Sequence, residues 1–324
     1  MPAADSISAE DRDLMRRLTL VLLFLFAFTA AFSGLDRVYS QKFLDVTGRA
    51  QWIWARQPMS ANDPVAFFAA RNFTLPEKRV YARLKVIGDP EYTLYVNGRE
   101  VAGRRLQSDQ RELDLYDISE LVHTGANRIV ITVRAPQGVG GLLASLDIAP
   151  ETENWVVTDA SWRIYRRWRP EILVHDVDAD WETPVLFGEP PIGRWNYLPL
   201  ARRAPDVPPS KTLAPHQAFP VIGYIPAIRT RAGIAIAVPE RGRATAFDFG
   251  FTRGRVRLVV DSDRYASRAF NVRYANIRPE LGLIDWSFRP VVFAPGEHVV
   301  TTPDVHNFRY VMVFGKNVRA EVVQ

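Results

Sequence analysis

Short stretches of alternating apolar and polar residues recur along most of the chain, separated by Gly, Pro, Asn and Asp. Residues 92–103, YTLYVNGREVAG, illustrate the pattern: the alternation runs up to Asn97-Gly98 and resumes after it. This predicts a β-hairpin with a type I′ turn. Every second residue from Tyr92 to Val96 would then lie on one face of a sheet. We interpret the hairpin as scaffold.

Segments of this kind fall into two groups, and beyond residue 50 we find no amphipathic helix pattern longer than about two turns. The sequence therefore predicts an all-β fold with two antiparallel β-sandwich domains. The expected strands are 66–75, 79–88, 92–98, 111–119, 127–135 and 141–149 in the first group, and 233–239, 245–250, 254–262, 269–276, 297–303, 308–315 and 318–324 in the second.

The exception is an apolar segment near the N-terminus, LTLVLLFLFAFTAAFSG (18–34), which carries no charge. As a helix it would span roughly 26 Å, slightly less than a ~30 Å hydrocarbon core, and Leu35 or local thinning makes up the difference. The alternative is a cleaved signal peptide, but the segment exceeds the usual ~7–15-residue apolar region of such peptides. We therefore predict an uncleaved transmembrane helix over 18–35, with these anchor residues: Leu18, Leu22, Phe26, Ala27 and Ala31.

The charges around this segment slightly favour a cytoplasmic N-terminus and an exported C-terminal bulk, because Arg12, Arg16 and Arg17 precede it and only Arg37 and Lys42 closely follow it. The predicted location is a bacterial inner membrane with the bulk in the periplasm. A stretch with five prolines (201–220) predicts a semi-rigid connection. The expected divisions are a cytoplasmic tail (1–17), the transmembrane helix (18–35), a spacer (36–50), a first β-sandwich (51–200), a Pro-rich linker (201–215) and a second β-sandwich (216–324).

Five motifs follow one another in the first β-sandwich: QWIW (51–54), a strand ending FTLP (73–76), the Asn-Gly hairpin, DLYDISELVHTGANRIVITV (114–133) and TDASWRI (158–164). Together they resemble the galactose-binding-domain-like β-sandwiches that accompany catalytic domains in bacterial α-L-rhamnosidases and related glycoside hydrolases. In the second β-sandwich, FDFGFTRGRVRLVV (247–260) and NFRYVMVFG (307–315) are similar to strands of a rhamnosidase accessory β-domain.

The resemblance implies a galactose-binding-like jelly-roll fold and, for the chain as given, no rhamnosidase activity. In those enzymes a helical (α/α) barrel carries the catalytic carboxylates, and these 324 residues contain no long helical patterns that could build one.

Candidate chemistry is sparse. The chain has no cysteine, which excludes disulfides, thiolate metal sites and cysteine nucleophiles. The formal net charge is +5, but its many arginines are scattered and form no nucleic-acid-binding arm. The five histidines lack zinc-binding spacing, and no GxSxG or phosphate loop occurs. We therefore predict no catalytic residues, no cofactor and no metal, and hence no enzyme.

One acidic stretch leaves an alternative open. Asp176, Asp178 and Asp180 would share one face of a strand and could bind calcium, although the stretch lacks the EF-hand pattern. A solvated loop or sheet edge is the other interpretation.

The eight tryptophans divide by position. Trp52, Trp54 and Trp162 lie within the family-like motifs, so we assign them to the core. Aromatic faces stack on sugar rings, and tryptophans in loops rich in Pro and Gly are candidates for such contacts. The candidate partner or glycan contacts are Trp181, Trp195 and Trp286.

Two functions from different classes follow. The first is a non-enzymatic, membrane-anchored periplasmic subunit of a larger membrane complex; Ala27 and Ala31 permit close packing against another helix. By architecture alone, the chain resembles the single-helix accessory subunits of some bacterial photosynthetic reaction-centre complexes. The second is a membrane-tethered carbohydrate-binding protein. A glycoside-hydrolase-related enzyme with an unrecognised site is a third, weaker alternative. The expected partners are the bilayer, an integral membrane complex and a glycan, and no nucleic acid.

Overall fold

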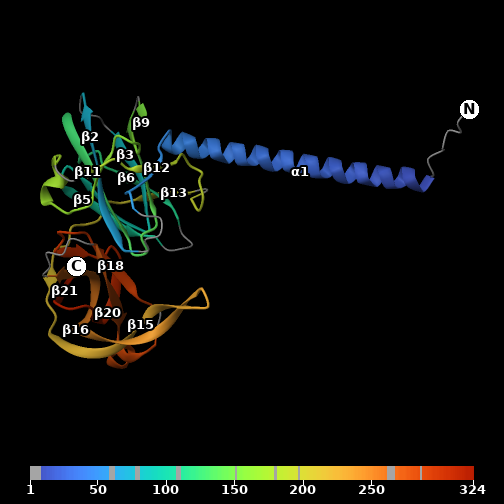
Figure 1. The fold of residues 1–324 in the computed structure, drawn as a ribbon. Helices are drawn as coiled ribbons and strands as arrows, with labels where there is room; N and C mark the ends of the chain where they lie inside the picture. Colours follow the sequence, from blue (N-terminus) through green and yellow to red (C-terminus); the bar gives the residue numbers. More distant parts are fainter. Residues whose placement is uncertain are drawn as a thin grey trace, which may run out of the picture.

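A long N-terminal helix is followed by two β-sandwich domains (Figure 1). The helix, α1, spans Ala9–Thr47, and domain 1 and domain 2 follow it along the chain. The coordinates are a computed structural model, which describes residues 9–57, 63–76, 81–106, 111–149, 152–178, 181–195, 198–260, 267–284 and 287–324.

Domain 1 consists of two sheets packed face to face. The first sheet has the strand order β12 (Val185–Gly188), β1 (Trp52–Trp54), β8 (Gly141–Ala149), β3 (Tyr81–Asp89), β6 (Leu113–Asp117), β13 (Leu200–Arg203), with β9 (Thr152–Val157) paired to β8. The second has the order β11 (Trp181–Glu182), β10 (Arg163–Tyr165), β2 (Val65–Leu75), β7 (Gly125–Ala135), β4 (Glu91–Val96), β5 (Arg99–Arg105). Apolar side chains from both sheets fill the space between them, including Trp54, Phe67, Leu94, Ile131 and Leu146.

The hairpin predicted from the Asn-Gly pair is confirmed as β4 and β5. Asn97 and Gly98 both have positive φ, 49° and 81°, as a type I′ turn requires. Tyr92, Leu94 and Val96 are fully buried on the core face, as their alternation predicts.

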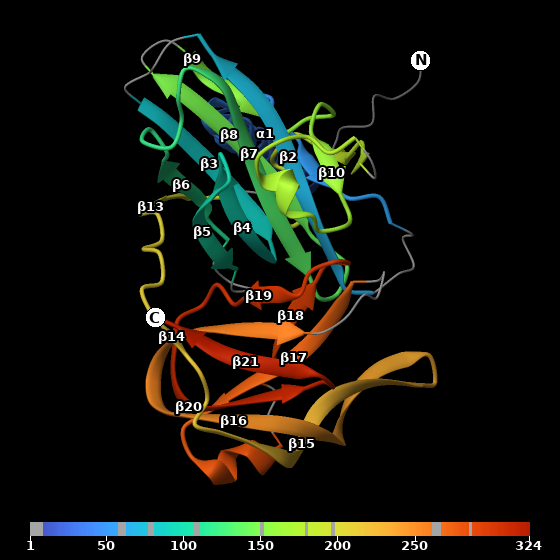
Figure 2. The ribbon, with the colours of Figure 1, turned by 90° about the vertical axis from the view of Figure 1, so that its left-hand side faces the viewer.

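Domain 2 is built on one eight-stranded sheet that folds around its own core (Figure 2). The order is β14 (Thr212–Leu213), β21 (Val318–Val323), β16 (Ile234–Val260), β20 (His306–Phe314), β17 (Arg268–Ala275), β18 (Arg289–Phe293), and both β15 (Gln217–Arg231) and β19 (Val299–Thr301) pair with β16. Two short 3-10 helices, η1 (Pro170–Leu173) in domain 1 and η2 (Arg278–Gly282) in domain 2, complete the elements. The predicted fold class, two antiparallel β-sandwiches after one apolar helix, is confirmed.

Three strands predicted separately at 233–239, 245–250 and 254–262 form the single long strand β16. Its pairing with β20 shifts register between Asp248 and Thr252, and Gly250 has φ of 68° there. β16 pairs with β20 on both sides of this bulge, up to Gly254, and continues against β21 from Arg255 without ending. Gly250, which separates two of the predicted strands, bends β16 instead of ending it.

Part of the predicted linker is also paired. Residues 200–203 form β13, which runs parallel to β6 at the edge of domain 1. Thr212 and Leu213 form β14, which pairs with the last strand, β21. The connection without strand structure is therefore shorter than the sequence predicts and covers residues 204–211.

The predicted spacer at 36–50 is largely helical, because α1 runs on to Thr47. The segment between Leu35 and Thr47 contains neither Gly nor Pro, so nothing in it breaks a helix. Gly48 ends the helix with φ of 57°, and a Cβ at this position would lie 2.6 Å from the Asn154 side chain. Gly48 is therefore a C-terminal helix stop that a larger residue would strain.

The two domains meet through a buried ion pair. Arg134 on β7 donates from Nη1 to Glu297 Oε2 at 2.6 Å and from Nη2 to Glu297 Oε1 at 2.7 Å. Both side chains are almost fully buried, and Arg134 Nη1 also donates to the Val292 carbonyl at 2.8 Å. Nearby, Arg105 donates to the Pro290 carbonyl at 2.9 Å. These contacts tie the second sheet of domain 1 to β18 of domain 2.

Candidate functional site

A polar recess lies at one end of domain 1, where chain segments distant in sequence meet. It has a volume of about 460 Å³ and is lined by the end of β2, the β4–β5 turn, the start of β7 with the loop before it, and the segment after η1. The pairing of β2, β7 and β4 brings these segments together, because the end of β2 and the end of β4 both lie beside the start of β7.

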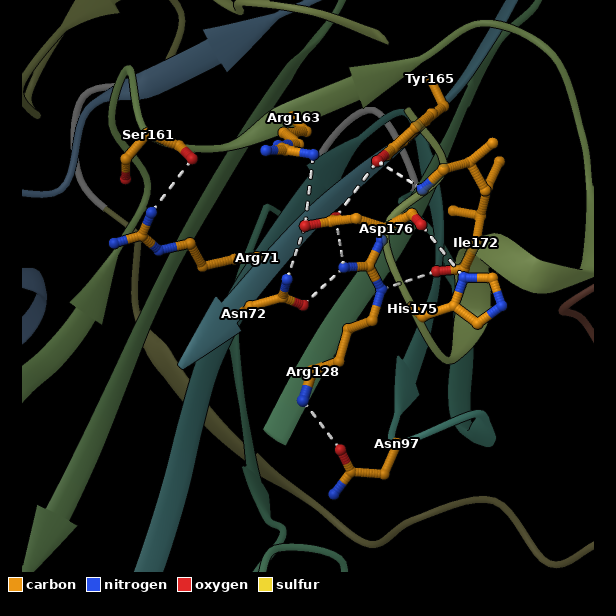
Figure 3. A network of polar contacts seen from close by, with 11 residues as sticks. Arg71, Asn72, Asn97, Arg128, Ser161, Arg163, Tyr165, Ile172, His175 and Asp176 are labelled. Atoms are coloured by element: carbon orange, nitrogen blue, oxygen red, sulfur yellow. Dashed lines mark hydrogen bonds and ion pairs between the residues drawn. The ribbon is translucent and has the colours of Figure 1, made fainter. Parts of the chain in front are cut away.

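Arg128, at the start of β7, is the centre of this recess (Figure 3). Its Nη1 donates to Asp176 Oδ1 at 2.7 Å and to Asn72 Oδ1 at 2.5 Å, and its Nε donates to the Ile172 carbonyl at 2.7 Å. The side chain is buried, and Nη2 has no hydrogen-bond partner. A buried guanidinium nitrogen without an acceptor is unusual, because the missing bond costs free energy. An acceptor from a ligand would relieve this cost.

Asp176 accepts hydrogen bonds from several sides. Asn72 Nδ2 donates to Oδ2 at 2.7 Å, Tyr165 donates to Oδ1 at 3.2 Å, and Arg163 lies 3.3 Å from Oδ2. Burial disfavours the charged carboxylate, but the hydrogen bond and charge of Arg128 outweigh burial, so the pKa of Asp176 lies below its usual value. The carboxylate therefore stays ionised at neutral pH and is a poor candidate for a general acid.

The Asn-Gly hairpin also contributes to the recess. Asn97 Oδ1 accepts from the Arg128 backbone N–H at 2.8 Å, and Asn97 Nδ2 donates to the Leu121 carbonyl at 2.8 Å and to Asn127 Oδ1 at 2.9 Å. Asn127 Nδ2 in turn donates to the His123 carbonyl at 2.6 Å. The hairpin is thus both scaffold, as predicted, and one wall of the recess.

Of the two candidate contact tryptophans that the structure describes, Trp181 lies beside this network. Its side chain is 43 % exposed, and the Arg163 guanidinium lies 4.7 Å from its ring centroid. The same Arg163 pairs with Asp176, so Trp181 extends the polar network to an exposed aromatic face. A contact role for Trp181 stays a prediction.

Trp195 does not lie on a surface loop as predicted. It is only 8 % exposed, its ring stacks on Trp52 with centroids 4.3 Å apart, and its Nε1 donates to Asp89 Oδ2 at 2.8 Å. The loop that carries it folds back over the first sheet, because so large an apolar ring gains more from burial than from exposure. We therefore correct Trp195 to a core residue. Trp286 lies outside the described residues.

In the described part of the acidic stretch, residues 175–178, no strand forms that would place the carboxylates on one face. Asp176 and Asp178 follow η1 in irregular structure, and Asp180 lies outside the described residues. Asp176 is engaged by two arginines, and Asp178 is exposed. Among the described residues, no group of three or more His, Asp or Glu side chains is arranged to hold a metal ion.

The apolar part of α1 is exposed on every side. Residues 13–35 form the one helix of the described chain that is long and apolar enough to cross a membrane. All five predicted anchor residues are exposed, including Phe26 at 73 % and Leu22 at 62 %. An apolar helix with no covering protein surface matches the length and composition of a membrane span or of a signal sequence.

The other end of α1 is fixed to domain 1. The Lys85 ammonium donates to the carbonyl of Val46 in the last turn and lies 2.8 Å from the Asp147 carboxylate. Thr47 is fully buried, and Gln51 N–H donates to the Thr158 carbonyl at 2.7 Å. A buried cation at a helix C-terminus is favourable, because the carbonyls there carry partial negative charge. The helix therefore joins the sandwich as a rigid extension.

Comparisons with known proteins establish the fold. No protein-family model matches the chain. An α-L-rhamnosidase from Streptomyces avermitilis is 29 % identical over 121 residues, which are 35 % of this chain and 12 % of that protein. The structure of an α-L-rhamnosidase from Dictyoglumus thermophilum superposes with a TM-score of 0.50 at 18 % identity over 85 % of this chain.

A lectin from Pleurotus ostreatus in complex with GalNAc superposes with a TM-score of 0.40 at 15 % identity, over 86 % of this chain and 77 % of the lectin. This chain covers 35 % of the Dictyoglumus thermophilum enzyme, so it spans about a third of that enzyme's length. The predicted resemblance to the galactose-binding-like β-sandwiches of α-L-rhamnosidases is confirmed at the level of the fold.

Proposed function

We propose that this protein is a membrane-anchored, non-catalytic accessory subunit, which holds two β-sandwich domains at a fixed position against a larger integral membrane complex. The observation that supports this most strongly is the continuity of α1. The helix passes from its exposed apolar part into the buried junction at Thr47 without a break. A helical connection fixes the distance and orientation of the domains relative to the membrane, as a structural subunit requires, whereas a flexible linker would let them sample many positions.

The chemistry of the recess supports a non-catalytic role. Its one carboxylate, the partly buried Asp176, is neutralised by Arg128 and Arg163. Glycoside hydrolysis needs two carboxyl groups, one of them with a raised pKa, and this carboxyl has a lowered one. We propose a bacterial inner membrane with the sandwiches on the periplasmic side. An energy-transducing complex such as a photosynthetic reaction centre is the partner class that the architecture suggested.

Purification in mild detergent tests this proposal. We expect the full chain to co-migrate stoichiometrically with an integral membrane complex. Replacing Ala27 and Ala31 with isoleucine keeps the helix apolar but removes its small-residue face, so the variant should stay in the membrane and lose the complex. Leu22→Ile is the matched control and should keep it. Migration alone in mild detergent would contradict the subunit role, and release of the wild-type chain from membranes by carbonate would contradict the anchor.

A membrane-tethered carbohydrate-binding protein is the second candidate, favoured by the polar recess beside an exposed aromatic ring. Amide, guanidinium and carboxylate groups suit the hydroxyls of a sugar, and the Trp181 face suits its C–H patches. We expect Trp181→Ala to weaken retention on an immobilised glycan by about tenfold. Trp155→Ala is the matched control, because Trp155 is equally exposed, at 42 %, but lies on β9 in the other sheet, whereas Trp181 contacts Arg163 of the recess network. Equal loss in both variants would contradict a sugar site at the recess.

A further inference from the structure

An arm of two strands projects from domain 2. β15 and the first part of β16 pair residue by residue from Gln217–Asp248 to Arg231–Ile234. Among the described residues, β15 pairs with β16 alone, and β16 reaches its other partners only from Thr245 onward. The outer part of this ribbon, residues 224–241, therefore stands away from the sheet (Figure 2). We call residues 224–241 the arm.

The arm is apolar where a free ribbon would be expected to be polar. Ile234 is 64 % exposed and Ile236 is 42 % exposed, and both lie next to the tip. They share one face of the ribbon with Arg231 and Arg229, which are their cross-strand partners. Exposed hydrophobic residues on a ribbon with open outer edges are a known aggregation hazard, so we expect another surface to cover them.

The charge of the arm indicates what that surface is. Arg229, Arg231 and Arg241 are opposed by a single acidic residue, Glu240, which lies 3.3 Å from the Arg229 guanidinium. The pair is well exposed, so water screens it. The tip thus presents isoleucines together with uncompensated arginine charge, which is the combination found on surfaces that settle into an anionic lipid interface.

The placement of the arm agrees with its composition. Figure 1 shows the arm leaving domain 2 on the side on which α1 leaves domain 1. Because α1 carries the apolar segment 13–35 away from the domains on that side, a bilayer that receives this segment lies in the direction of the arm. The helix continues about 18 Å from Leu35 to Thr47. This helical segment separates domain 1 from the bilayer. An arm with nine residues in each strand is roughly 30 Å long, which is enough to cross a separation of that size.

We propose that the arm is a second membrane contact: its tip settles into the headgroup region of an anionic phospholipid bilayer, with Ile234 and Ile236 toward the acyl chains and Arg229 and Arg231 on lipid phosphates. The proposal rests on the membrane insertion of α1 but not on any partner complex. The contact stays at the interface, because the unpaired edges of the ribbon need water or headgroups as hydrogen-bond partners.

The anchor makes such a weak contact effective. Two isoleucines and two arginines alone would bind a membrane marginally and reversibly. The anchor helix converts this binding into an intramolecular step, so the tip meets lipid at a high effective concentration. Two contact points also restrain the tilt of the domains against the bilayer.

The absence of cysteine permits a direct test. In the full chain reconstituted in nanodiscs that contain phosphatidylglycerol, Ala232→Cys places one environment-sensitive fluorophore at the arm tip. We expect its emission to shift to shorter wavelength and to be quenched by nitroxide-labelled lipid. The control Val207→Cys labels a residue that is 85 % exposed in the connection between the domains, and its label should remain in water.

Charge variants test the lipid specificity. Each arginine near an anionic surface contributes about 1 kcal/mol, so R229Q/R231Q should lower the ratio of inserted to free tip about thirtyfold in phosphatidylglycerol and little in phosphatidylcholine. R202Q/R319Q removes the same charge from exposed positions on the two sandwiches and should have little effect. These variants change only surface residues, so folding is retained.

The possible outcomes distinguish a failure of the arm proposal from a failure of membrane anchoring by α1. If the chain floats with nanodiscs but the tip label stays in water at every lipid composition, the arm does not bind the membrane. If the label shifts only when a co-purified protein complex is present, the arm is a protein-binding element and the inference is also wrong. If the chain does not associate with nanodiscs at all, the anchor itself fails.

Discussion

The Arg134–Glu297 pair between the domains leads to a quantitative prediction. Arg134→Met removes a guanidinium that makes two hydrogen bonds of 2.6 and 2.7 Å to a carboxylate, with both side chains at least 93 % buried. Burial alone would disfavour the charged guanidinium, but Glu297 and Glu91 raise the pKa of Arg134 well above its usual value. The arginine is therefore charged throughout the accessible pH range.

Removing one partner leaves the other charge buried, and such a change costs about 3–5 kcal/mol. For domains of this size, 1 kcal/mol corresponds to roughly 2–4 °C in Tm, so we expect Tm to fall by about 10 °C. The measurement is thermal unfolding of the full chain in detergent, followed by tryptophan fluorescence and circular dichroism. Because the pair ties the domains together, the variant should also unfold in two steps where the wild type unfolds in one.

Two further variants complete this experiment. R134M/E297Q has no unpaired buried charge and should recover more than half of the loss, because replacing a whole buried ion pair is far less costly than breaking it. Arg229→Gln breaks the exposed pair with Glu240 and should leave Tm unchanged. A loss below about 1 kcal/mol for R134M, or no recovery in the double variant, would refute the reasoning.

Three more predictions follow from local geometry. Gly48→Ala should destabilise the junction by about 1–2 kcal/mol, because the φ of Gly48 is positive and a Cβ there would meet the Asn154 side chain. Hydrogen exchange in the last turn of α1 measures this loss, and unchanged exchange would contradict a rigid joint. Burial lowers the pKa of His306, so the unfolded chain binds more protons than the folded chain, and the free energy of unfolding should fall as pH drops through about 6.5. In urea titrations, His306→Gln should reduce the dependence of this free energy on pH. An identical pH dependence would exclude this histidine as the cause. The pKa of Asp176 is lowered despite partial burial, because Arg128 pairs with it. The contribution of this carboxylate to the free energy of unfolding should therefore be present at neutral pH and lost as pH falls below about 3.8. In acid titrations followed by circular dichroism, Asp176→Asn should lose less stability than the wild type.

The alternation of apolar and polar residues was sufficient to predict most of domain 1. The hairpin at Asn97-Gly98 follows from local chemistry, because a type I′ turn needs two positive φ angles. The strands of domain 2 were harder to predict, since glycines mark both turns and bulges. Gly250 bends β16 without ending it, and only the pairing with β20 and β21 distinguishes the two cases.

The recess could not be predicted, for a different reason. Asn72, Arg128 and Asp176 come from positions up to 104 residues apart, and only the strand pairing brings them together. In a chain rich in arginine, Arg128 carries no local signal. Trp195 was wrongly placed because a loop composition rich in Pro and Gly says where the backbone turns, but not whether its largest side chain faces the core.

Because α1 runs unbroken into domain 1, the direction in which the two sandwiches face depends on the number of residues in the helix. Each residue of an α-helix advances the chain by about 100° and 1.5 Å. One residue inserted between Leu35 and Thr47 would therefore swing both domains about 100° around the helix axis. Seven inserted residues would return them to within about 20° of the original bearing and lift them roughly 10 Å. The number of residues in this short helical segment thus determines how both domains are rotated about the helix axis. This rotation in turn determines which neighbouring molecules each face of the protein can contact.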